Sequence, residues 1–191
     1  MNNGLLIVLS GPSGVGKGTI IRKVLNSDTN IVLSISATTR PMRINEKEGE
    51  NYHFVLIDEF KELILKGEML EYAMVYDNYY GTPKNKTIEL LDSGRDVMLE
   101  IDTVGARNIK NMYSDALTIF LKPPSMEVLI ERLRGRGTET PEVFTKRIAA
   151  VTYELEQAIN YDYEVLNDDA DICAKEVIEI IHNEKIKRLN K

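Results

Sequence analysis

The stretch GPSGVGKGT, which runs from Gly11 to Thr19, decides the fold. It follows the apolar run LLIVL at residues 5–9 and precedes IIRKVL at residues 20–25, which has a helical pattern. A glycine-rich turn between a strand and a helix points backbone N–H groups at a phosphate, and the helix dipole adds positive charge there. Lys17 adds a cation for the β and γ phosphates. Because these features agree, the stretch predicts a nucleoside triphosphate site rather than a turn that binds nothing.

All residues of this loop are candidate ATP-binding residues: Gly11, Pro12, Ser13, Gly14, Val15, Gly16, Lys17, Gly18 and Thr19. The strict form of the motif has Ser or Thr where this chain has Gly18. The hydroxyl group of Thr19 is therefore the expected contact of the loop with Mg²⁺.

Along the rest of the chain, short runs rich in β-branched residues alternate with segments of helical pattern. The expected strands are 5–10, 31–36, 97–101, 116–121 and 164–166, and the expected helices are 17–25, 84–92, 104–112, 126–133, 142–160 and 174–189. This alternation predicts a parallel sheet with helices on both faces. Thr140 and Pro141 are typical of the N-cap and first residue of one of these helices.

Two segments interrupt the alternation. Between Thr38 and Thr82, a helix is expected over 59–65, with strands over 52–57 and 69–76. This pattern predicts a small inserted lobe. The sequence Gly-Arg-Gly at 135–137 interrupts another pair of helices, and it predicts a mobile, charged flap.

Length and charge limit the range of functions. At 191 residues with 43% hydrophobic content, the chain is long enough for one sizeable core. Its net charge of -6 disfavours broad binding to nucleic acid or to an anionic membrane, so we expect neither partner. The single Cys173 and the lack of a signal-peptide pattern predict a cytoplasmic location. Monomer and homo-oligomer both stay open.

Acidic residues lie at the end of the apolar strand 97–101, where they could act near a metal ion. A metal ion matters because phosphoryl transfer needs one, together with cations on the transferring phosphate and an acceptor held in line. Asp102 stands where a carboxylate near Mg²⁺ is expected, and strand alternation puts Glu100 on the same side. The alternative for Asp102 is an ordinary carboxylate that closes a strand.

A pair of arginines, Arg132 and Arg136, stands one helical turn apart. These like charges repel unless an anion or a carboxylate lies between them. A triphosphate would supply the anion, and Arg147 would join them if the flap folds over as a lid. The alternative is a solvated basic face paired with nearby glutamates, but the phosphate-binding loop favours the lid.

The segment SATTRPMR, residues 36–43, places two arginines and several hydroxyl groups directly after a strand. The planar guanidinium groups of Arg40 and Arg43 suit a pair of phosphate oxygens. Tyr52 and Tyr80 are candidates to donate phenolic hydrogen bonds to the same phosphate, with packing in the core as the alternative.

Together these segments resemble the guanylate kinase family. The resemblance rests on residues 11–19, 36–46 with its TTRPxR core, 78–82, 99–102 and 132–140, and it spans residues 5 to about 184. It implies an α/β, three-layer P-loop NTPase fold with a central parallel sheet, an inserted mixed α/β GMP-binding lobe and a helical lid. The implied core is 1–36, 83–123 and 151–191, the lobe is 37–82 and the lid is 124–150, within one domain over 4–184.

The resemblance also implies an activity, the ATP-dependent phosphorylation of GMP and dGMP with Mg²⁺ by direct in-line transfer. The 5′-phosphate of GMP would be bound by Arg40, Arg43, Tyr52 and Tyr80, with Glu46 supporting the arginines. The guanine pocket would comprise Ser36, Glu71, Thr82, Glu100 and Asp102. The catalytic residues would be Lys17, Arg40, Arg132, Arg136 and Arg147, with Mg²⁺ near Thr19 and Asp102 and with Asn167 beside adenine.

The chemistry of guanine agrees with this assignment of Glu71. Guanine presents N1–H and N2–H side by side, and one carboxylate accepts both. Adenine would leave Glu71 unpaired, at a cost of roughly 1–3 kcal/mol for a buried polar group. The sequence therefore predicts selection of guanine over adenine.

Two alternative functions stay open at this point. A kinase of the same superfamily acting on ribose bisphosphate would share the loop and the lid but have no use for Glu71. A non-catalytic guanylate-kinase-like scaffold module typically loses the lysine or the glycines of the loop, and this chain retains Lys17, Gly11 and Gly16.

Overall fold

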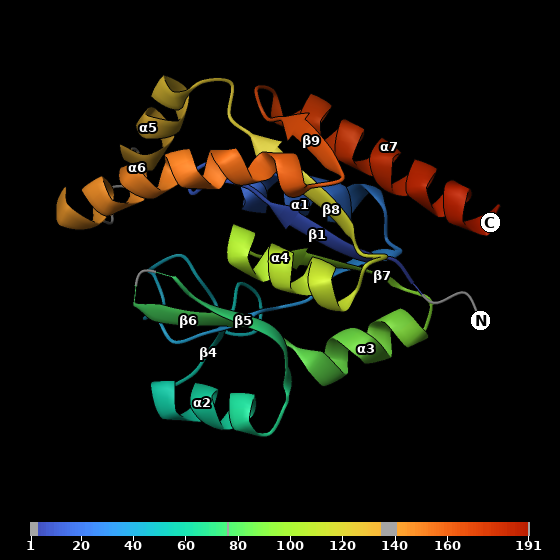
Figure 1. The fold of residues 1–191 in the computed structure, drawn as a ribbon, viewed down its shortest axis with the longest axis horizontal. Coiled ribbons are helices and arrows are strands. Elements are labelled where there is room, and N and C mark those ends of the chain that lie inside the picture. The colour runs from blue at the N-terminus through green and yellow to red at the C-terminus, as the bar shows by residue number, and fades with distance from the viewer. Residues whose placement is uncertain (1–3, 76, 135–140, 191) are drawn as a thin grey trace. The chain divides into compact units, whose positions relative to one another are not determined.

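The structure is a computed structural model that describes residues 4–75, 77–134 and 141–190, without the side chains of 141–147 (Figure 1). It is a mixed α/β protein with a five-stranded sheet of order β2-β7-β1-β8-β9 and a four-stranded sheet of order β4-β3-β6-β5. The chain divides into two compact units: unit 1 is Met1–Val8 with Asn30–Ala116, and unit 2 is Leu9–Thr29 with Leu117–Lys191. The lobe and lid boundaries expected from the sequence stay predictions.

The elements of unit 1 are as follows. Strand β1 (Leu6–Ser10) begins in it, and it holds β2 (Ile31–Leu33), β3 (Ala37–Thr38), β4 (His53–Phe54), α2 (Ile57–Leu65), β5 (Met69–Val75), β6 (Asn78–Pro83), α3 (Lys84–Asp92), β7 (Asp96–Glu100) and α4 (Thr103–Met112). Unit 2 holds α1 (Lys17–Ser27), β8 (Leu117–Lys122), α5 (Met126–Arg134), α6 (Pro141–Glu156), a 3₁₀ turn over Gln157–Asn160, β9 (Tyr163–Leu166) and α7 (Ala170–Leu189).

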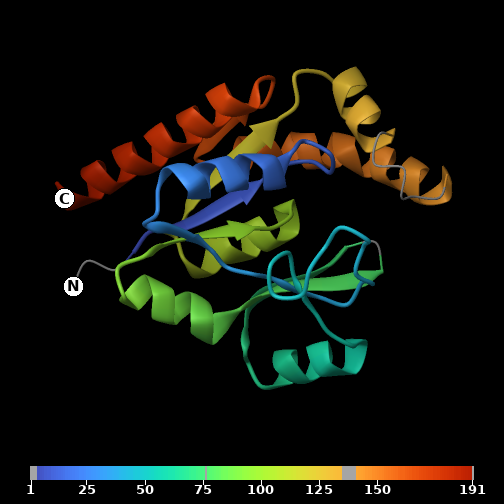
Figure 2. The same cartoon turned by 180° about the vertical axis from the view of Figure 1, so that it is seen from behind.

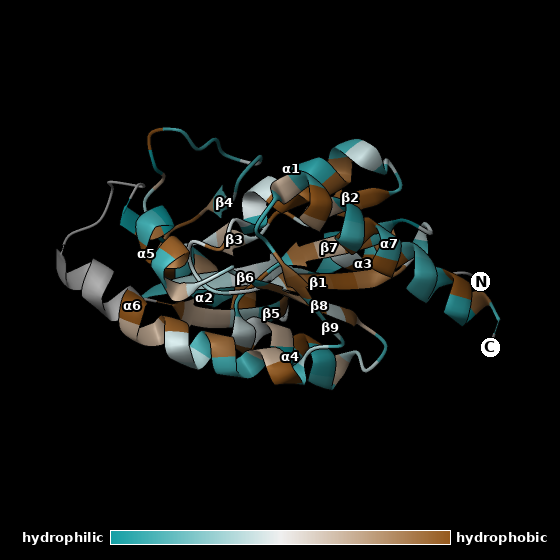
Figure 3. Ribbon diagram, turned by 90° about the horizontal axis from the view of Figure 1, so that it is seen from above, coloured by the Kyte–Doolittle hydropathy of each residue, from teal (hydrophilic) through white to brown (hydrophobic). Residues whose placement is uncertain are grey.

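The large sheet is built from the apolar runs that the sequence predicted. Strands β2 and β7 pair in parallel, as do β8 and β9. Residues 97–99 of β7 are fully buried, and Figure 3 colours β1 and β7 as hydrophobic. At the start of β7, the buried carboxylate of Asp96 accepts hydrogen bonds from Leu5 N at 2.9 Å and from Asn30 Nδ2 at 2.9 Å. The parallel sheet of the expected fold is confirmed.

The small sheet of unit 1 carries the region between Thr38 and Thr82. Strands β5 and β6 form an antiparallel pair in which Glu71 lies opposite Thr82, and β3 pairs antiparallel with β6 (Figure 1). Helix α2 buries Phe60, whose ring stacks on Tyr79 with centroids 5.2 Å apart. This packing fixes α2 against β6.

The strand expected over 52–57 is present but shorter than predicted. Only His53–Phe54 is a strand, and Ile57 already begins α2. The Glu59 side chain accepts a hydrogen bond from Leu56 N at 2.8 Å, which satisfies a backbone donor at the helix start. Strands β3 and β6 were not expected, because β3 is very short and β6 contains Gly81 and Pro83, both unfavourable in strands.

In unit 2, α1 and α7 pack against each other, and Figure 2 shows them side by side. Helix α7 begins at Ala170 rather than at the expected 174. The carboxylate of Asp169 caps it by accepting hydrogen bonds from the N–H groups of Asp171 at 2.8 Å and Ile172 at 3.0 Å. The predicted N-cap Thr140 and the predicted flap over 135–137 lie outside the described residues. Of the helices in the described ranges, none is both long and apolar enough to span a membrane.

Candidate active site

The expected ATP-binding loop lies in unit 2 between β1 and α1. Gly14 and Gly16 have backbone φ angles of 87° and 103°, which residues with a side chain rarely adopt. A Cβ atom at Gly14 would lie 2.8 Å from the side chain of Leu133, and one at Gly16 would lie 2.8 Å from Asn167 Nδ2. Gly16 is also the N-cap of α1 and supplies no side-chain acceptor. The loop therefore has the backbone form that an anion-binding turn requires.

Lys17 is the first residue of α1, and its ammonium group reaches back over the loop. Its Nζ donates hydrogen bonds to the carbonyl oxygens of Gly11 at 2.6 Å and Pro12 at 3.3 Å. The cation is thus held beside the same backbone whose N–H groups are expected to bind phosphate.

The carbonyl of Val15, in the middle of the loop, accepts hydrogen bonds from two predicted site residues. Asn167 Nδ2 donates to it at 2.7 Å and Arg132 Nη1 at 3.3 Å. Arg132 Nη1 also donates to the carbonyl of Asn167 at 3.2 Å, and Asn167 is only 4% exposed. We call Arg132 and Asn167 the loop brace. The contact of Asn167 with the loop was not expected from the sequence, and its expected place beside adenine stays a prediction.

Sequence reasoning missed one further contact of the loop. The backbone N–H of Ser13 donates to Glu154 Oε2 of α6 at 3.3 Å. No local pattern marks this pair, because 141 positions separate the two residues. The predicted arginines Arg136 and Arg147 have side chains outside the described part of the chain. We call the loop, Lys17 and the loop brace the donor site.

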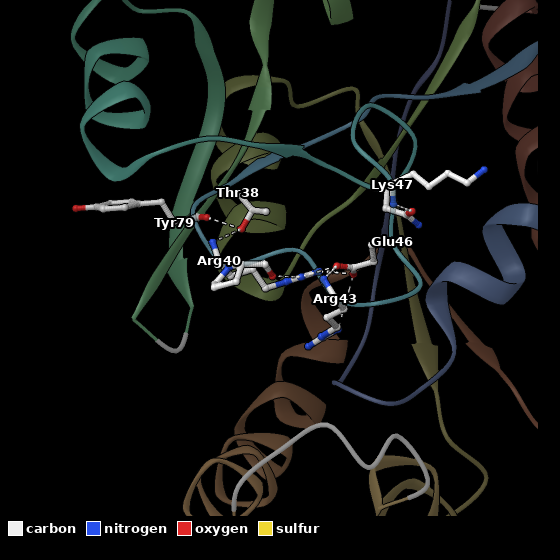
Figure 4. A network of polar contacts seen from close by, with 8 residues as sticks. Thr38, Arg40, Arg43, Glu46, Lys47 and Tyr79 are labelled. Atoms are coloured by element: carbon white, nitrogen blue, oxygen red, sulfur yellow. Dashed lines mark hydrogen bonds and ion pairs between the residues drawn. The ribbon is translucent and has the colours of Figure 1, made fainter.

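The ten predicted GMP-binding residues all lie in unit 1, and we call them the acceptor site. The part expected to bind phosphate is centred on Glu46, whose carboxylate lies beside Arg40 and Arg43 in Figure 4. Arg40 donates to Glu46 Oε2 at 2.6 Å and to Oε1 at 2.5 Å, and the N–H of Arg43 donates to Oε2 at 2.9 Å. Burial disfavours the ionised carboxylate, but these hydrogen bonds hold the pKa of Glu46 below its ordinary value. Glu46 therefore holds the guanidinium group of Arg40 and the backbone of Arg43.

Aromatic rings surround Arg40. Its guanidinium carbon lies 5.0 Å from the centroid of Tyr52 and 5.6 Å from that of Phe54. Tyr52 meets Tyr80 edge to face at 5.9 Å, so the structure brings these two predicted residues together. Burial, and after it the charge of Glu100, raises the pKa of Tyr52, which keeps its hydroxyl group a donor. Phe54 was not predicted, because a phenylalanine in a strand normally signals only core packing.

The base-binding part of the acceptor site is centred on Glu71, on β5. Glu71 is 6% exposed, and its Oε1 accepts a hydrogen bond from Thr82 Oγ1 at 2.8 Å. Burial, together with the negative charge of Asp102, raises the pKa of Glu71 to about 7, although hydrogen bonds from Thr82 oppose the shift. Ser36 is also buried, whereas Glu100, at the end of β7, is half-buried.

Asp102 has a local role that the sequence did not predict. It is the N-cap of α4, and its Oδ1 accepts a hydrogen bond from Gly105 N at 2.8 Å. A capping carboxylate stabilises the start of a helix. The carboxylate of Asp102 therefore stabilises the start of α4, and its negative charge also acts on Glu71.

Comparison with known proteins agrees with this arrangement. The guanylate kinase family model matches residues 3–184. A guanylate kinase of Clostridioides difficile is 48% identical over 187 residues, which cover 98% of this chain and 91% of that protein. One from Zymomonas mobilis is 46% identical, covering 97% and 86%.

A solved structure agrees as well. The crystal structure of guanylate kinase from Anaplasma phagocytophilum matches with a TM-score of 0.82 at 35% identity, covering 96% of this chain and 87% of that one. The sequence motifs, the strand order and these similarities lead to one conclusion: the chain belongs to the guanylate kinase family.

Proposed function

We propose that this chain catalyses the ATP-dependent phosphorylation of GMP and dGMP to the diphosphates, as a step of purine nucleotide metabolism. The observation that carries the proposal is the buried carboxylate of Glu71, held by Thr82 in the same unit as the Arg40–Glu46 pair. A ribose bisphosphate kinase would not need a buried carboxylate for a base. A scaffold module would not need Lys17 and the loop glycines. The family relationship supports neither alternative.

In the donor site, backbone N–H groups of the loop and the ammonium of Lys17 bind the β and γ phosphates of ATP. The arginines Arg132, Arg136 and Arg147 neutralise charge that develops on the transferring phosphoryl group. Asn167, whose amide donates to Val15 O, holds the loop in shape and also lies beside the adenine ring.

In the acceptor site, Arg40, Arg43, Tyr52 and Tyr80 bind the 5′-phosphate of GMP. Glu46 keeps Arg40 in place through two hydrogen bonds. The Arg40 guanidinium also donates to the carbonyl of Pro41 at 2.9 Å and lies beside the rings of Tyr52 and Phe54, so its planar group is held in one orientation, which suits a pair of phosphate oxygens. The acceptor oxygen is already an anion, and no general base is needed.

The guanine base is recognised by Glu71, which accepts N1–H and N2–H. The hydroxyl group of Ser36 donates to guanine O6. Thr82 donates to Glu71 Oε1 and so turns the carboxylate toward the base. Glu100 and Asp102 complete the rim of the base pocket. Their negative charges disfavour a base that presents hydrogen-bond acceptors toward them.

Mg²⁺ is the proposed metal ion. It prefers oxygen ligands, and in kinases it binds one or two protein groups, substrate phosphates and water. The residues that the structure describes include no cluster of three or more His, Cys, Asp or Glu suited to a metal, which fits an ion held mainly by phosphates. Thr19, exposed in the first turn of α1, offers a hydroxyl oxygen, and Asp102 would act through water. The bound ion would neutralise phosphate charge.

We further propose residues 37–82 as the GMP-binding lobe and 124–150 as the lid. Their closure would exclude water, which strengthens the charge interactions and prevents hydrolysis of ATP. The cytoplasm is the proposed location.

The test is Mg²⁺-dependent formation of ADP from ATP, with GMP, dGMP, AMP, CMP, UMP, dTMP and ribose bisphosphate offered separately. We expect turnover with GMP and dGMP alone. Turnover with the sugar phosphate would establish the first alternative, and no turnover with any acceptor in a folded sample that binds GMP would establish the scaffold.

A further inference from the structure

Gly105 lies in the first turn of α4, against the side chain of Glu71. A Cβ atom at Gly105 would lie 2.6 Å from Glu71 Oε2 and 3.2 Å from its carboxyl carbon. Both distances, one from carbon to oxygen and one from carbon to carbon, are shorter than ordinary van der Waals contacts. The carboxylate of Glu71 therefore occupies the space that the side chain of any other residue would take.

The backbone conformation does not require glycine at this position. Gly105 is not among the glycines with positive φ in the described chain, and it lies within the regular helix Thr103–Met112. Inside a helix, glycine is less favourable than alanine because it loses more conformational freedom on folding. Only the space beside Glu71 gives a physical reason for glycine here.

Both partners in this contact are held in place. The N–H of Gly105 donates to Asp102 Oδ1 at 2.8 Å, which anchors the start of α4. Thr82 holds the other oxygen of Glu71 at 2.8 Å, and the carboxylate is buried. A methyl group at position 105 would displace the end of the Glu71 side chain more readily than the capped helix, because a side chain rotates at lower cost than a helix moves.

We propose that Gly105 is a positioning residue for guanine recognition, whose lack of a side chain leaves room for the Glu71 carboxylate to face N1–H and N2–H of the base. This inference rests on the proposed function, in which Glu71 binds guanine. Gly105 itself touches no substrate, and its effect on recognition passes through Glu71.

The experiment compares Gly105→Ala with the unaltered chain on two acceptors, GMP and IMP. IMP keeps N1–H and O6 but lacks the 2-amino group, so the ratio of their kcat/KM values reports the second hydrogen bond to Glu71. We expect this ratio to fall roughly tenfold or more, since loss of a matched buried hydrogen bond changes discrimination on that scale. The loss appears as a raised KM for GMP, with kcat at saturation nearly unchanged.

Asn111→Ala is the matched control, because Asn111 is exposed on the same helix and the substitution also favours helix. It leaves the ratio unchanged. If Gly105→Ala lowers kcat/KM for GMP and IMP by the same factor, or leaves both unchanged, Gly105 serves packing alone and the inference is overturned.

Glu71→Gln separates the inference from the proposed function. If Glu71→Gln keeps the GMP to IMP ratio, the assignment of Glu71 to the base is wrong. If it lowers the ratio, adding Gly105→Ala should have little further effect, because both changes act through one carboxylate. A full additional loss in the double variant would contradict the inference.

If Gly105→Ala does not fold, the double variant Gly105→Ala with Glu71→Asp tests the inference instead. The shorter side chain withdraws the carboxylate from position 105, so the double variant should recover thermal stability. If stability is not recovered, the clash involves another group and the inference is overturned.

Discussion

In unit 2, the donor site is built around one continuous loop of backbone, whereas in unit 1 the acceptor site is a cluster of side chains from separate loops and strands. The loop depends on the positive φ angles of Gly14 and Gly16. Its Val15 carbonyl accepts hydrogen bonds from Arg132 and Asn167, the loop brace. The acceptor site instead pairs side chains with side chains, as in Arg40 with Glu46 and Thr82 with Glu71.

The difference follows from what each site has to recognise. Phosphate groups are alike in all nucleoside triphosphates, and backbone N–H groups with one lysine suffice to bind them. A base is distinguished by its pattern of donors and acceptors, which only placed side chains can match. Damage to the donor site should therefore affect turnover with every acceptor, and damage to the acceptor site should change which acceptor is used.

The largest expected effect lies in the donor site. Lys17→Ala removes the cation held against Gly11 O and should lower kcat by roughly 10²–10³-fold with any acceptor, since it removes charge stabilisation of the transition state. The measurement is steady-state turnover with GMP and with dGMP, beside a thermal melt that shows an unchanged fold. Full activity of a folded variant would refute the loop assignment.

A tenfold effect is expected from the loop brace. Asn167→Ala removes the 2.7 Å hydrogen bond to Val15 O and leaves only the longer one from Arg132. Loss of a buried hydrogen bond is worth about 1–3 kcal/mol, so KM for ATP should rise roughly tenfold while KM for GMP stays constant. Equal changes in the two KM values would contradict a role confined to the donor site.

A several-fold effect is expected from pH in the acceptor site. Because the pKa of Glu71 is raised to about 7, lowering the pH through 7 protonates the carboxylate that we propose accepts hydrogen bonds from guanine. The ratio of kcat/KM for GMP to that for IMP should therefore fall between pH 8 and pH 6, and the titration of the 5′-phosphate cancels in this ratio. Glu71→Gln should show no such dependence; a parallel pH profile would assign it to another group.

The same pKa shift predicts the sign of a stability effect. The folded pKa of Glu71 lies above its ordinary value of 4.5, so the folded state favours the protonated carboxyl. Its contribution to stability is fully present below pH 4.5 and is lost as the pH rises through about 7. Thermal melts should show that Glu71→Gln gains stability over the unaltered chain between pH 5 and 8. A constant difference would contradict the shift.

The smallest expected effect concerns Phe54. Phe54→Leu keeps an apolar side chain but removes the ring 5.6 Å from the Arg40 guanidinium carbon. A cation–π contact is worth about 0.5–1 kcal/mol at such sites, so KM for GMP should rise roughly two- to fivefold. KM for ATP is the internal control; a rise of the same size there would mean that the change is not confined to the acceptor site.

The local elements of the fold were predictable from the sequence. The apolar runs that became β1, β7 and β8, and the glycine-rich loop before α1, show their structure in a few neighbouring residues. The boundaries of α2 and α7 were not predicted, because side-chain acceptors at Glu59 and Asp169 start these helices and competed with the strand or loop pattern.

The candidate site was predictable in part. Arg40, Glu46, Tyr52 and Tyr80 were expected to act together, and the structure brings them into contact. Phe54, Glu154 and Gly105 were not expected, because each acts through a partner that only the folded chain brings near. The roles of all these residues in binding and catalysis stay predictions for the experiments above.

The sequence by itself determined the phosphate-binding loop of the donor site, because such a loop is built from consecutive residues whose backbone angles depend on local glycines. It also determined the alternation of strands and helices in the large sheet, since periodicity is a local property, but it did not predict β3 or β6. Only the tertiary structure decided that Thr82 and Gly105 flank the carboxylate of Glu71, and that Asn167 holds the loop at Val15. The physical reason is that buried hydrogen bonds and excluded volume depend on distances in space, and these connect residues that no local pattern relates.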